Sequence, residues 1–311
     1  MKLISVVTPC YNEEENVEDL CRAIAAQFSN LPGYDFEHLL IDNGSTDATP
    51  EILRRTAATD PRVKVILNRR NFGHVRSFYH AVLESRGDAT IVMASDFQDP
   101  PEYIPRFIRK WEEGNPIVLA VKTESRETPA IHAVRKLYYA LLNALSDVPL
   151  VKDATGFGIY DQKVVAELRK LEDPYPYFRG LVIDLGFKPA LIEFVQPRRK
   201  RGFTKNNFYT LYDMAMLGIT NHSKLPLRLA AFIGFGMSFL SFLTGIAYLI
   251  YKLLFWDRFS VGMAPVVIGL FLFSSVQLFF IGILGEYIGA IHTQVLRRPL
   301  VVEKERINFD T

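Results

Sequence analysis

The chain has 311 residues, of which 49% are hydrophobic and 23% are charged, and its formal net charge is +2. This composition excludes an intrinsically disordered protein, and the length suits two ordinary domains. The two cysteines, Cys10 and Cys21, are too few for a disulfide framework and lack metal-binding spacing, so both are expected to be reduced thiols. The N-terminal run MKLISVVTPCYNEEEN turns acidic too early for a cleavable signal peptide, which predicts a cytosolic N-terminal part.

Roughly the first 120 residues alternate between short β-branched runs and helical patterns. The strand candidates are LISVVT, EHLLID, RVKVIL, ATIVMA and PIVLAV. This alternation predicts a mostly parallel sheet covered by helices, an α/β fold. After the first strand, Asn12 and Glu15 have the spacing of a capping box. The apolar residues that then recur at helical spacing are Val17, Leu20, Ile24 and Phe28.

Polar segments follow four of these strands: TPCYNEE, IDNGSTD, NRRNFGH and ASDFQDPPE. Sites in open α/β sheets lie at the carboxyl ends of the strands, where such loops gather. Each segment alone has a structural explanation, since DNGSTD for example is good turn and helix-cap chemistry. Four polar strand ends along one edge nevertheless predict a binding site there.

Two segments between the sheet and the C-terminal part are amphipathic with bulky apolar faces, near residues 129–146 and 206–222. Such helices could belong to a core. Beside a membrane anchor, they are expected to lie in the membrane interface.

Residues 229–251 and 261–285 contain no Asp, Glu, Lys or Arg. Each stretch is long enough to cross a bilayer as a helix, whereas a buried core helix rarely runs so far without a polar face. The basic flanks are Lys224, Arg228, Arg297 and Arg298, and the short turn between the stretches carries Lys252, Asp257 and Arg258. This distribution predicts a transmembrane hairpin with both chain ends in the cytoplasm.

The strand-end segments VVTPCYNEEENV, LLIDNGSTDAT, LNRRNFGHVRSF and ASDFQDPPEYIP resemble the successive motifs of family 2 glycosyltransferases with a GT-A fold. Together with DATGFGIYD, PYFRGLVIDLGF, RRKRGFTK and two C-terminal spans, they resemble the polyisoprenyl-phosphate glycosyltransferases. Bactoprenol glucosyltransferases are the nearer likeness, and dolichol-phosphate mannose synthases are a more distant one. The resemblance implies a GT-A domain over residues 1–228, a transmembrane hairpin over 229–292 and a cytoplasmic tail over 293–311.

The resemblance implies a nucleotide-sugar pocket at the edge identified above. The residues that would enclose the base and ribose are Pro9, Tyr11, Asn12, Glu13, Asp42, Gly44 and Ser45, with Arg70 and Asn71 at the side of the pocket and Ser95 and Asp96 completing it. A carboxylate accepts hydrogen bonds from an imide or a ribose hydroxyl, and a tyrosine ring covers an apolar face. The structural alternatives are ordinary packing for Tyr11 and a solvated charge for Arg70.

The family places a DxD-type motif where this chain has Ala94, Ser95 and Asp96, so the first acid is missing. Mg²⁺ (or Mn²⁺) needs only one or two protein oxygens besides substrate phosphates, so Asp96 with Gln98 is expected to hold the metal. Asp99 precedes two prolines and is expected mainly to cap the following helix.

The reaction implied is the inverting transfer of a hexose, with glucose from UDP-glucose favoured, to a polyprenyl phosphate such as undecaprenyl phosphate. Asp96, Asp153, Arg199 and Lys205 are the residues expected to carry it, with Lys122, Arg126 and Arg135 on the acceptor phosphate. Asp153 would orient the acceptor or act as a base, or it would instead only fix its own loop. The basic residues would otherwise form a solvated patch or attract anionic lipid.

The expected partners are a nucleotide sugar, a polyprenyl phosphate, the membrane and further copies of the chain, with no nucleic acid. The expected location is the bacterial inner membrane, with the catalytic domain in the cytoplasm. A processive polysaccharide synthase remains an alternative, although it would have more spans and a Q-x-x-R-W segment. A non-catalytic nucleotide-sugar-binding membrane protein is the other alternative, and it would explain Ala94 and Asn43 as decay.

Overall fold

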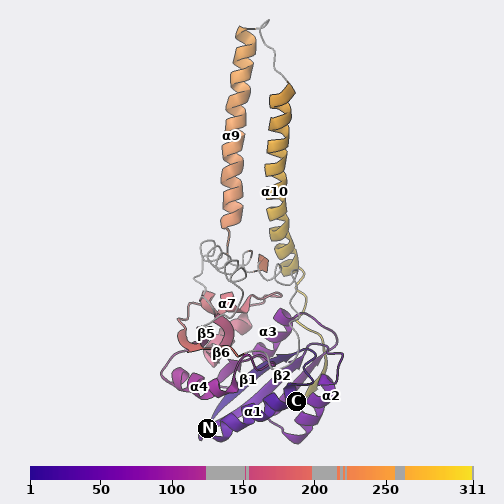
Figure 1. The fold of residues 1–311 in the computed structure, drawn as a ribbon, viewed down its shortest axis with the longest axis vertical. Helices are drawn as coiled ribbons and strands as arrows, with labels where there is room; N and C mark the ends of the chain where they lie inside the picture. Colours follow the sequence, from indigo (N-terminus) through magenta and orange to yellow (C-terminus); the bar gives the residue numbers. More distant parts are fainter. Residues whose placement is uncertain are drawn as a thin grey trace.

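One mixed sheet organises the fold, which is seen in a computed structural model that describes residues 1–123, 151, 154–197, 216–217, 220, 223–255 and 263–309. The strands are β1 (Lys2–Cys10), β2 (Tyr34–Asp42), β3 (Val63–Asn68), β4 (Ala89–Val92), β5 (Ile117–Lys122), β6 (Ala154–Asp161), β7 (Ala190–Phe194) and β8 (Glu303–Ile307). Their order is β7-β5-β6-β4-β1-β2-β3-β8. The sheet forms the centre of the domain in Figure 1.

The predicted mostly parallel sheet is confirmed. Strands β1 to β4 pair in parallel, as do β5 and β7, and each of the first five strands lies where a β-branched run predicted it. Strand β6 is antiparallel to both β4 and β5, and β8 is antiparallel to β3. The sequence patterns did not indicate β6, β7 or β8.

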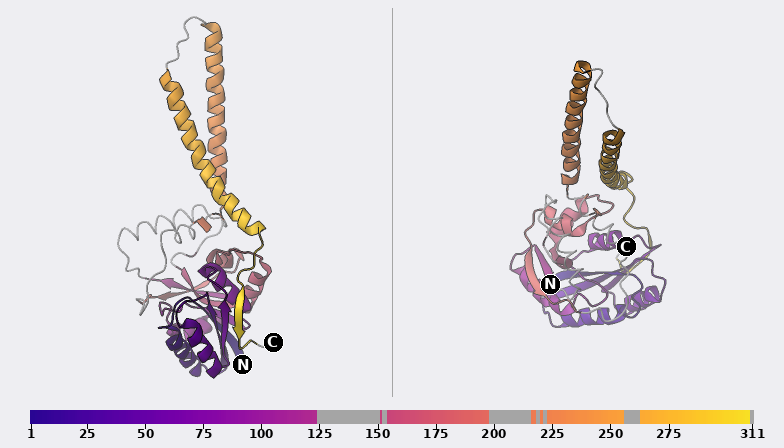
Figure 2. Two further views of the ribbon diagram at one scale, coloured as in Figure 1. Left: turned by 90° about the vertical axis from the view of Figure 1, so that its right-hand side faces the viewer. Right: turned by 45° about the horizontal axis from the view of Figure 1, so that its top comes forward.

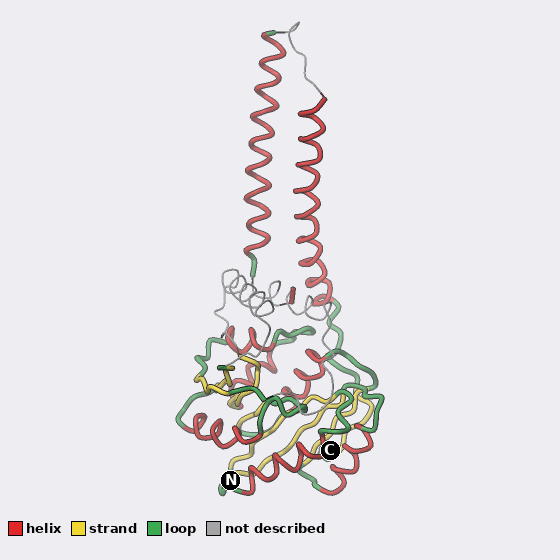
Figure 3. The backbone as a smooth tube through the Cα atoms, in the orientation of Figure 1, coloured by secondary structure: helices red, strands yellow, loops and turns green. Residues whose placement is uncertain are grey.

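Helices cover both faces of the sheet, as Figure 3 shows. They are α1 (Val17–Ser29), α2 (Thr49–Thr59), α3 (His74–Glu84), the 3₁₀ turn η1 (Pro101–Tyr103), α4 (Ile104–Glu112), α6 (Gln162–Lys170) and α7 (Phe178–Asp184). The core on one face includes buried side chains of α1 and α4, and the core on the other includes those of α3, α6 and α7. This burial explains why the central strands are apolar on both sides, because both faces of the sheet are covered there.

Helix α1 confirms the predicted apolar face, since Val17, Leu20, Ile24 and Phe28 are all buried. The predicted capping box is wrong. The helix begins after Asn16, and no side-chain hydrogen bond caps it. Asn12 instead adopts a left-handed conformation with φ of 56°, and its side-chain oxygen accepts a hydrogen bond from the Thr46 amide at 2.8 Å. The loop after β1 is therefore organised by the loop after β2, which local spacing does not encode.

Two long apolar helices, α9 (Leu225–Leu254) and α10 (Met263–Val295), extend from one side of the domain (Figure 1, Figure 2). Both are long and apolar enough to cross a membrane, and none of the most apolar window of either helix is buried. At the domain end, the Tyr287 hydroxyl donates to the carbonyl of Ser223 at 2.7 Å. Gln294 Nε2 donates to Asp173 Oδ1 at 2.8 Å, which ties α10 to the segment before α7.

The segment after α10 returns to the sheet and forms its edge strand, β8. Glu305 Oε2 accepts hydrogen bonds from Arg54 Nε and Nη2 at 3.0 and 2.8 Å. The Glu303 carboxylate lies 2.6 Å from His80 Nε2. The stretch predicted as a cytoplasmic tail thus contains a strand of the same sheet, and its charged side chains pair with α2 and α3.

Candidate active site

The carboxyl ends of β1 to β5 and the start of β6 lie along one edge of the sheet, as their pairing requires. This edge gathers the predicted site residues that the structure describes: Pro9, Tyr11, Asn12, Glu13, Asp42, Gly44, Ser45, Arg70, Asn71, Ser95, Asp96, Gln98 and Lys122. The first nine follow or end β1, β2 and β3. The last four follow β4 or end β5, on the other side of β1. The site is therefore assembled from segments far apart in the sequence.

The loops after β1 and β2 are joined by direct hydrogen bonds. The Asn12 amide donates to Ser45 Oγ at 2.8 Å, and the Glu13 amide donates to Thr49 Oγ1 at 2.8 Å. In the same region the Ala48 amide donates to Glu14 Oε2 at 2.9 Å. These bonds satisfy backbone amides that a sharp strand-to-helix turn would otherwise leave unpaired. They fix the relative position of the residues predicted to surround the nucleotide.

Asp42 is buried at the end of β2, and burial raises the pKa of its carboxyl group. Three hydrogen bonds oppose that rise. Its Oδ2 accepts from the amides of Gly44 and Ser45 at 3.1 and 3.0 Å, and its Oδ1 accepts from the Ser45 hydroxyl. Asp42 thus shapes the turn in which Gly44 and Ser45 lie.

Gly44 is the point of closest approach between the loops after β2 and β3. Its φ is +75°, and an added Cβ would lie 2.6 Å from the carbonyl carbon of Arg70 and 2.8 Å from the nitrogen of Asn71. No other amino acid fits there without displacing the Arg70 backbone. The guanidinium carbon of Arg70 lies 4.0 Å from the centre of the Phe72 ring, which holds this side chain against its own loop.

Asn43 is a central residue of this edge, although the sequence patterns gave it no role in the site. Its Oδ1 accepts from the Phe72 amide at 2.9 Å and from Asn68 Nδ2 at 3.3 Å. Its Nδ2 donates to Asn71 Oδ1 at 2.9 Å, and its own amide donates to the carbonyl of Cys10 at 2.9 Å. Asn43 therefore connects the ends of three strands, and this role counts against its interpretation as a decayed site residue.

The loop after β4 is a strained, internally bonded turn. Phe97 has a φ of 60°, a conformation that bulky residues rarely adopt. Asp96 Oδ1 accepts from the Gln98 amide at 3.1 Å, and Asp99 Oδ2 accepts from the Ala94 amide at 2.9 Å. The predicted helix-cap role of Asp99 is wrong, since neither η1 nor α4 has a side-chain cap. Asp99 instead closes the loop that carries Asp96.

Two cations approach the buried Asp99 carboxyl group. Burial raises the pKa of Asp99 to about 6, the neighbouring Asp96 adds to the rise, and the charges of Lys122 and Arg179 oppose it. Lys122 is the last residue of β5. Arg179 comes from α7, and no role was predicted for it although it lies in the motif PYFRGLVIDLGF. The effect of the Arg179 charge on the Asp99 pKa depends on the fold and could not be inferred from the sequence.

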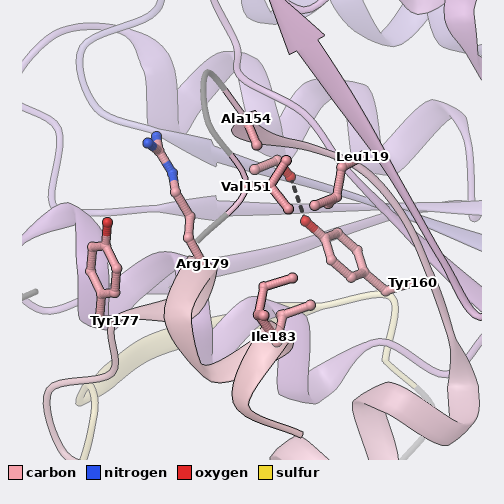
Figure 4. A pocket seen from close by; sticks show the side chains of 9 residues that line it. Leu119, Val151, Ala154, Tyr160, Tyr177, Arg179 and Ile183 are labelled. Carbon is pink, nitrogen blue, oxygen red and sulfur yellow. Dashed lines mark hydrogen bonds between the residues drawn. The ribbon is translucent and has the colours of Figure 1, made fainter. Parts of the chain in front are cut away.

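A small cavity lies between β5, β6 and α7, beside this edge (Figure 4). Its inner wall is apolar, with Leu119, Val182 and Ile183, and the Tyr160 hydroxyl there donates to the Gly156 carbonyl at 2.8 Å. In Figure 4, Arg179 extends past this wall, with its guanidinium group turned away from Ile183. Arg179 is thus exposed at the edge of the cavity.

The donor atoms at the Asp96 loop suit a metal that shares its ligands with a substrate. Within the described ranges no group of three or more His, Cys, Asp or Glu side chains could hold a metal by itself. Asp96 and Gln98 offer one carboxylate and one amide oxygen, and hard cations such as Mg²⁺ accept such oxygens together with phosphate oxygens. These residues fit a metal brought to the site with a diphosphate.

Several predicted features lie outside the described residues. They are Arg126, Arg135, Asp153, Arg199 and Lys205, the amphipathic segment near 129–146 and most of that near 206–222. Both cysteines are free, as predicted, and the structure shows both to be buried.

The chain is similar to known proteins over nearly its whole length. It is 36% identical over 307 residues to an uncharacterized glycosyltransferase of Bacillus subtilis strain 168, covering 98% of this chain and 94% of that protein. It is 32% identical over 304 residues to a bactoprenol glucosyl transferase of Shigella phage SfX, covering 97% and 99%. The crystal structure of glucosyl-3-phosphoglycerate synthase from Mycobacterium tuberculosis, in complex with Mn²⁺, UDP and phosphoglyceric acid, aligns at a TM-score of 0.49 and 21% identity, covering 70% and 76%.

Two families match consecutive parts of the chain. Residues 5–169 match Glycosyl transferase family 2, and residues 225–291 match the GtrB C-terminal hairpin. The first match contains most of β1, all of β2 to β6 and every predicted nucleotide-site residue, and the second contains α9 and most of α10. The chain therefore belongs to glycosyltransferase family 2, with a GT-A sheet followed by the two-helix hairpin of the GtrB type.

Proposed function

We propose that this glycosyltransferase transfers glucose from UDP-glucose to undecaprenyl phosphate, with inversion at the anomeric carbon. The observation that carries the proposal is that one chain combines the sheet edge of the nucleotide-site residues with two bilayer-length helices, and that α10 contacts the sheet domain at Asp173. The phage relative is named a bactoprenol glucosyl transferase, which supports both the sugar and the lipid.

The reaction forms one bond and breaks one. An oxygen of the lipid phosphate attacks the anomeric carbon, and the bond from that carbon to the UDP oxygen breaks, so that UDP leaves with the electron pair. A phosphate monoester has a second pKa of about 6 and is largely ionised at cytosolic pH, so it hardly needs a general base. The protein must therefore mainly position two anionic substrates and offset their charge.

A divalent cation held by Asp96 and Gln98, when bound, would neutralise charge on the departing diphosphate. The loops after β1, β2 and β3 would hold the nucleoside, with Tyr11, Asp42 and Arg70 as contacts. Asp96 then lies between the nucleoside side and the β5–β6 side of the edge. We assign Arg199 and Lys205 to phosphate binding, Asp153 to orienting the acceptor, and Lys122, Arg126 and Arg135 to the acceptor phosphate.

The same proposal places both ends of the hairpin in the cytoplasm. Strand β8 follows α10 and pairs with β3 of the domain that precedes α9, and a chain that crosses a membrane twice ends where it began. The return of the chain from α10 to the sheet therefore supports a hairpin with both ends on the same side of the membrane. Single cysteines at Asn308 and Phe255 should react from opposite sides of sealed vesicles, with little background from the buried Cys10 and Cys21. Labelling of both positions from one side would contradict it.

The decisive experiment incubates membranes containing the protein with undecaprenyl phosphate and a panel of radiolabelled nucleotide sugars. We expect a single labelled lipid product, from UDP-glucose, that releases glucose on mild acid treatment. A lengthening polysaccharide would favour a processive synthase, and nucleotide binding without any product would favour a non-catalytic protein. A lipid product from another nucleotide sugar would keep the reaction class and reject glucose.

A further inference from the structure

We propose that Arg179 binds the phosphate group of the lipid acceptor, so that α7 contributes a substrate contact to the site. The inference rests on the proposed function and deepens it. It places the acceptor on the β5–β6 side of Asp96, opposite the nucleotide loops.

The first support is the location of α7 on the side of the domain from which α9 and α10 extend (Figure 1, Figure 2). Asp173, which precedes α7, accepts hydrogen bonds from Gln294 of α10 at 2.8 Å and from the Tyr175 amide at 2.9 Å. A head group that arrives from the membrane beside α10 therefore meets the segment leading into α7.

The second support is that α7 is a rigid base for an exposed cation. Phe178 is buried, with its ring centre 5.0 Å from that of Phe78 and 5.1 Å from that of Tyr160. Val182, one turn later, is buried too. Arg179 lies between them and is exposed, and no described residue forms a hydrogen bond or ion pair with it. The buried neighbours fix the helix while the guanidinium group keeps its donors for a ligand.

The third support is what Arg179 faces. A Cβ added at Gly156 would lie 3.8 Å from Arg179 Nε, so this side chain passes over bare backbone near the start of β6. Gly156 has a φ of +93° and no side chain to fill that space. Lys122, at the end of neighbouring β5, acts on the same buried Asp99 as Arg179 does. Two cations, Lys122 and Arg179, thus act on the loop that carries Asp96, and Arg179 also acts on His74 at the start of α3.

Phosphate is the ligand that this arrangement suits. The guanidinium group forms paired, charge-assisted hydrogen bonds to phosphate oxygens, and the lysine adds a second positive charge. The donor diphosphate is less suitable as its target, because the predicted nucleoside contacts follow β1, β2 and β3, on the other side of β4 in the strand order. The acceptor phosphate would then lie beside the leaving diphosphate, as the attack requires.

The test compares Arg179→Gln, Arg179→Lys and the control Arg109→Gln in the full-length protein. Arg109 is an exposed arginine of α4, away from the strand ends that form the site. We measure the KM for a polyprenyl phosphate, the KM for UDP-glucose, and the binding of UDP and of farnesyl phosphate by calorimetry in detergent. Arg179→Gln should raise the acceptor KM about 10- to 100-fold, as expected for one charge-assisted contact. Arg179→Lys should have an intermediate effect, and Arg109→Gln should match the unsubstituted protein.

Two outcomes overturn the inference. Equal losses of UDP and farnesyl phosphate binding in Arg179→Gln would assign Arg179 to the donor diphosphate or to general folding, and unchanged binding of both would make it a surface charge. Failure of the proposed function is distinguishable, because the unsubstituted protein would then form no glycolipid. In that case the binding measurements still decide the role of Arg179. Only a loss of farnesyl phosphate binding with unchanged UDP binding in Arg179→Gln supports the inference.

Discussion

Gly44→Ala should weaken nucleotide binding through the loop after β3. The added methyl group would lie 2.6 Å from the carbonyl carbon of Arg70 and 2.9 Å from its Cα. Carbon atoms prefer separations of about 3.5–4.0 Å, so the Arg70 loop must move by roughly 1 Å. Because misplacement of about that size can cost about 100-fold in activity, we expect UDP affinity to fall about 10- to 100-fold.

Gly33→Ala is the matched control. Gly33 also has a positive φ, of +99°, but an added Cβ there would have nothing within 4 Å. Both substitutions should therefore cost about 1–2 kcal/mol of stability from the left-handed backbone. Calorimetric titration with UDP and thermal unfolding, on both variants, separate the two effects. If Gly44→Ala and Gly33→Ala lowered UDP affinity equally, close loop packing would not explain the role of Gly44.

Three further predictions concern the metal loop, a core histidine and the C-terminal strand. Asp96→Asn should lower turnover about 100-fold across a magnesium and manganese titration, whereas Asp99→Asn keeps an acceptor for its loop amide and should cost less than about tenfold; a larger loss in Asp99→Asn would make that carboxylate the main ligand. Burial lowers the pKa of His38 to about 3 from its usual 6.5, so protonation favours unfolding. The free energy of unfolding in detergent should fall by about 1.4 kcal/mol per pH unit as the pH drops below 6.5, a slope that His38→Gln should reduce. Deletion of residues 302–311 exposes the β3 edge and should lower the melting temperature by roughly 5 °C and cause aggregation on gel filtration; a monodisperse protein of unchanged melting temperature would contradict this.

The first five strands could be predicted because buried parallel strands are continuous β-branched runs, as in LISVVT. Strand β6 was missed because Gly156 and Gly158 interrupt its apolar pattern. A Cβ at Gly158 would lie 2.3 Å from the Val118 carbonyl oxygen, so the glycine reflects close strand pairing rather than a turn. Strand β8 reads EKERI, and its charges are those of an edge strand with ion-pair partners elsewhere in the chain.

The gathering of the candidate residues at one sheet edge could be predicted, but the bonds that connect them could not. Polar strand ends located the edge, and the family resemblance supplied roles for residues such as Asp42 and Asp96. The hydrogen bonds of Asn43 and the loop closure by Asp99 depend on segments that meet only in the fold. Arg179 was missed for the same reason, because a single arginine in a short helix has no local pattern that marks it.

The return of β8 also has a consequence for the order of biosynthesis. Arg54 and Glu305, which pair across this edge, are 251 residues apart in the chain. At about 5–20 residues per second, β3 leaves the ribosome well before β8 does. Both apolar helices are made in between, so the edge of β3 has no partner until the hairpin has been synthesised. In the proposed topology, the sheet can therefore be completed only after the hairpin has been made, and a chain that ends early keeps an open strand edge at β3.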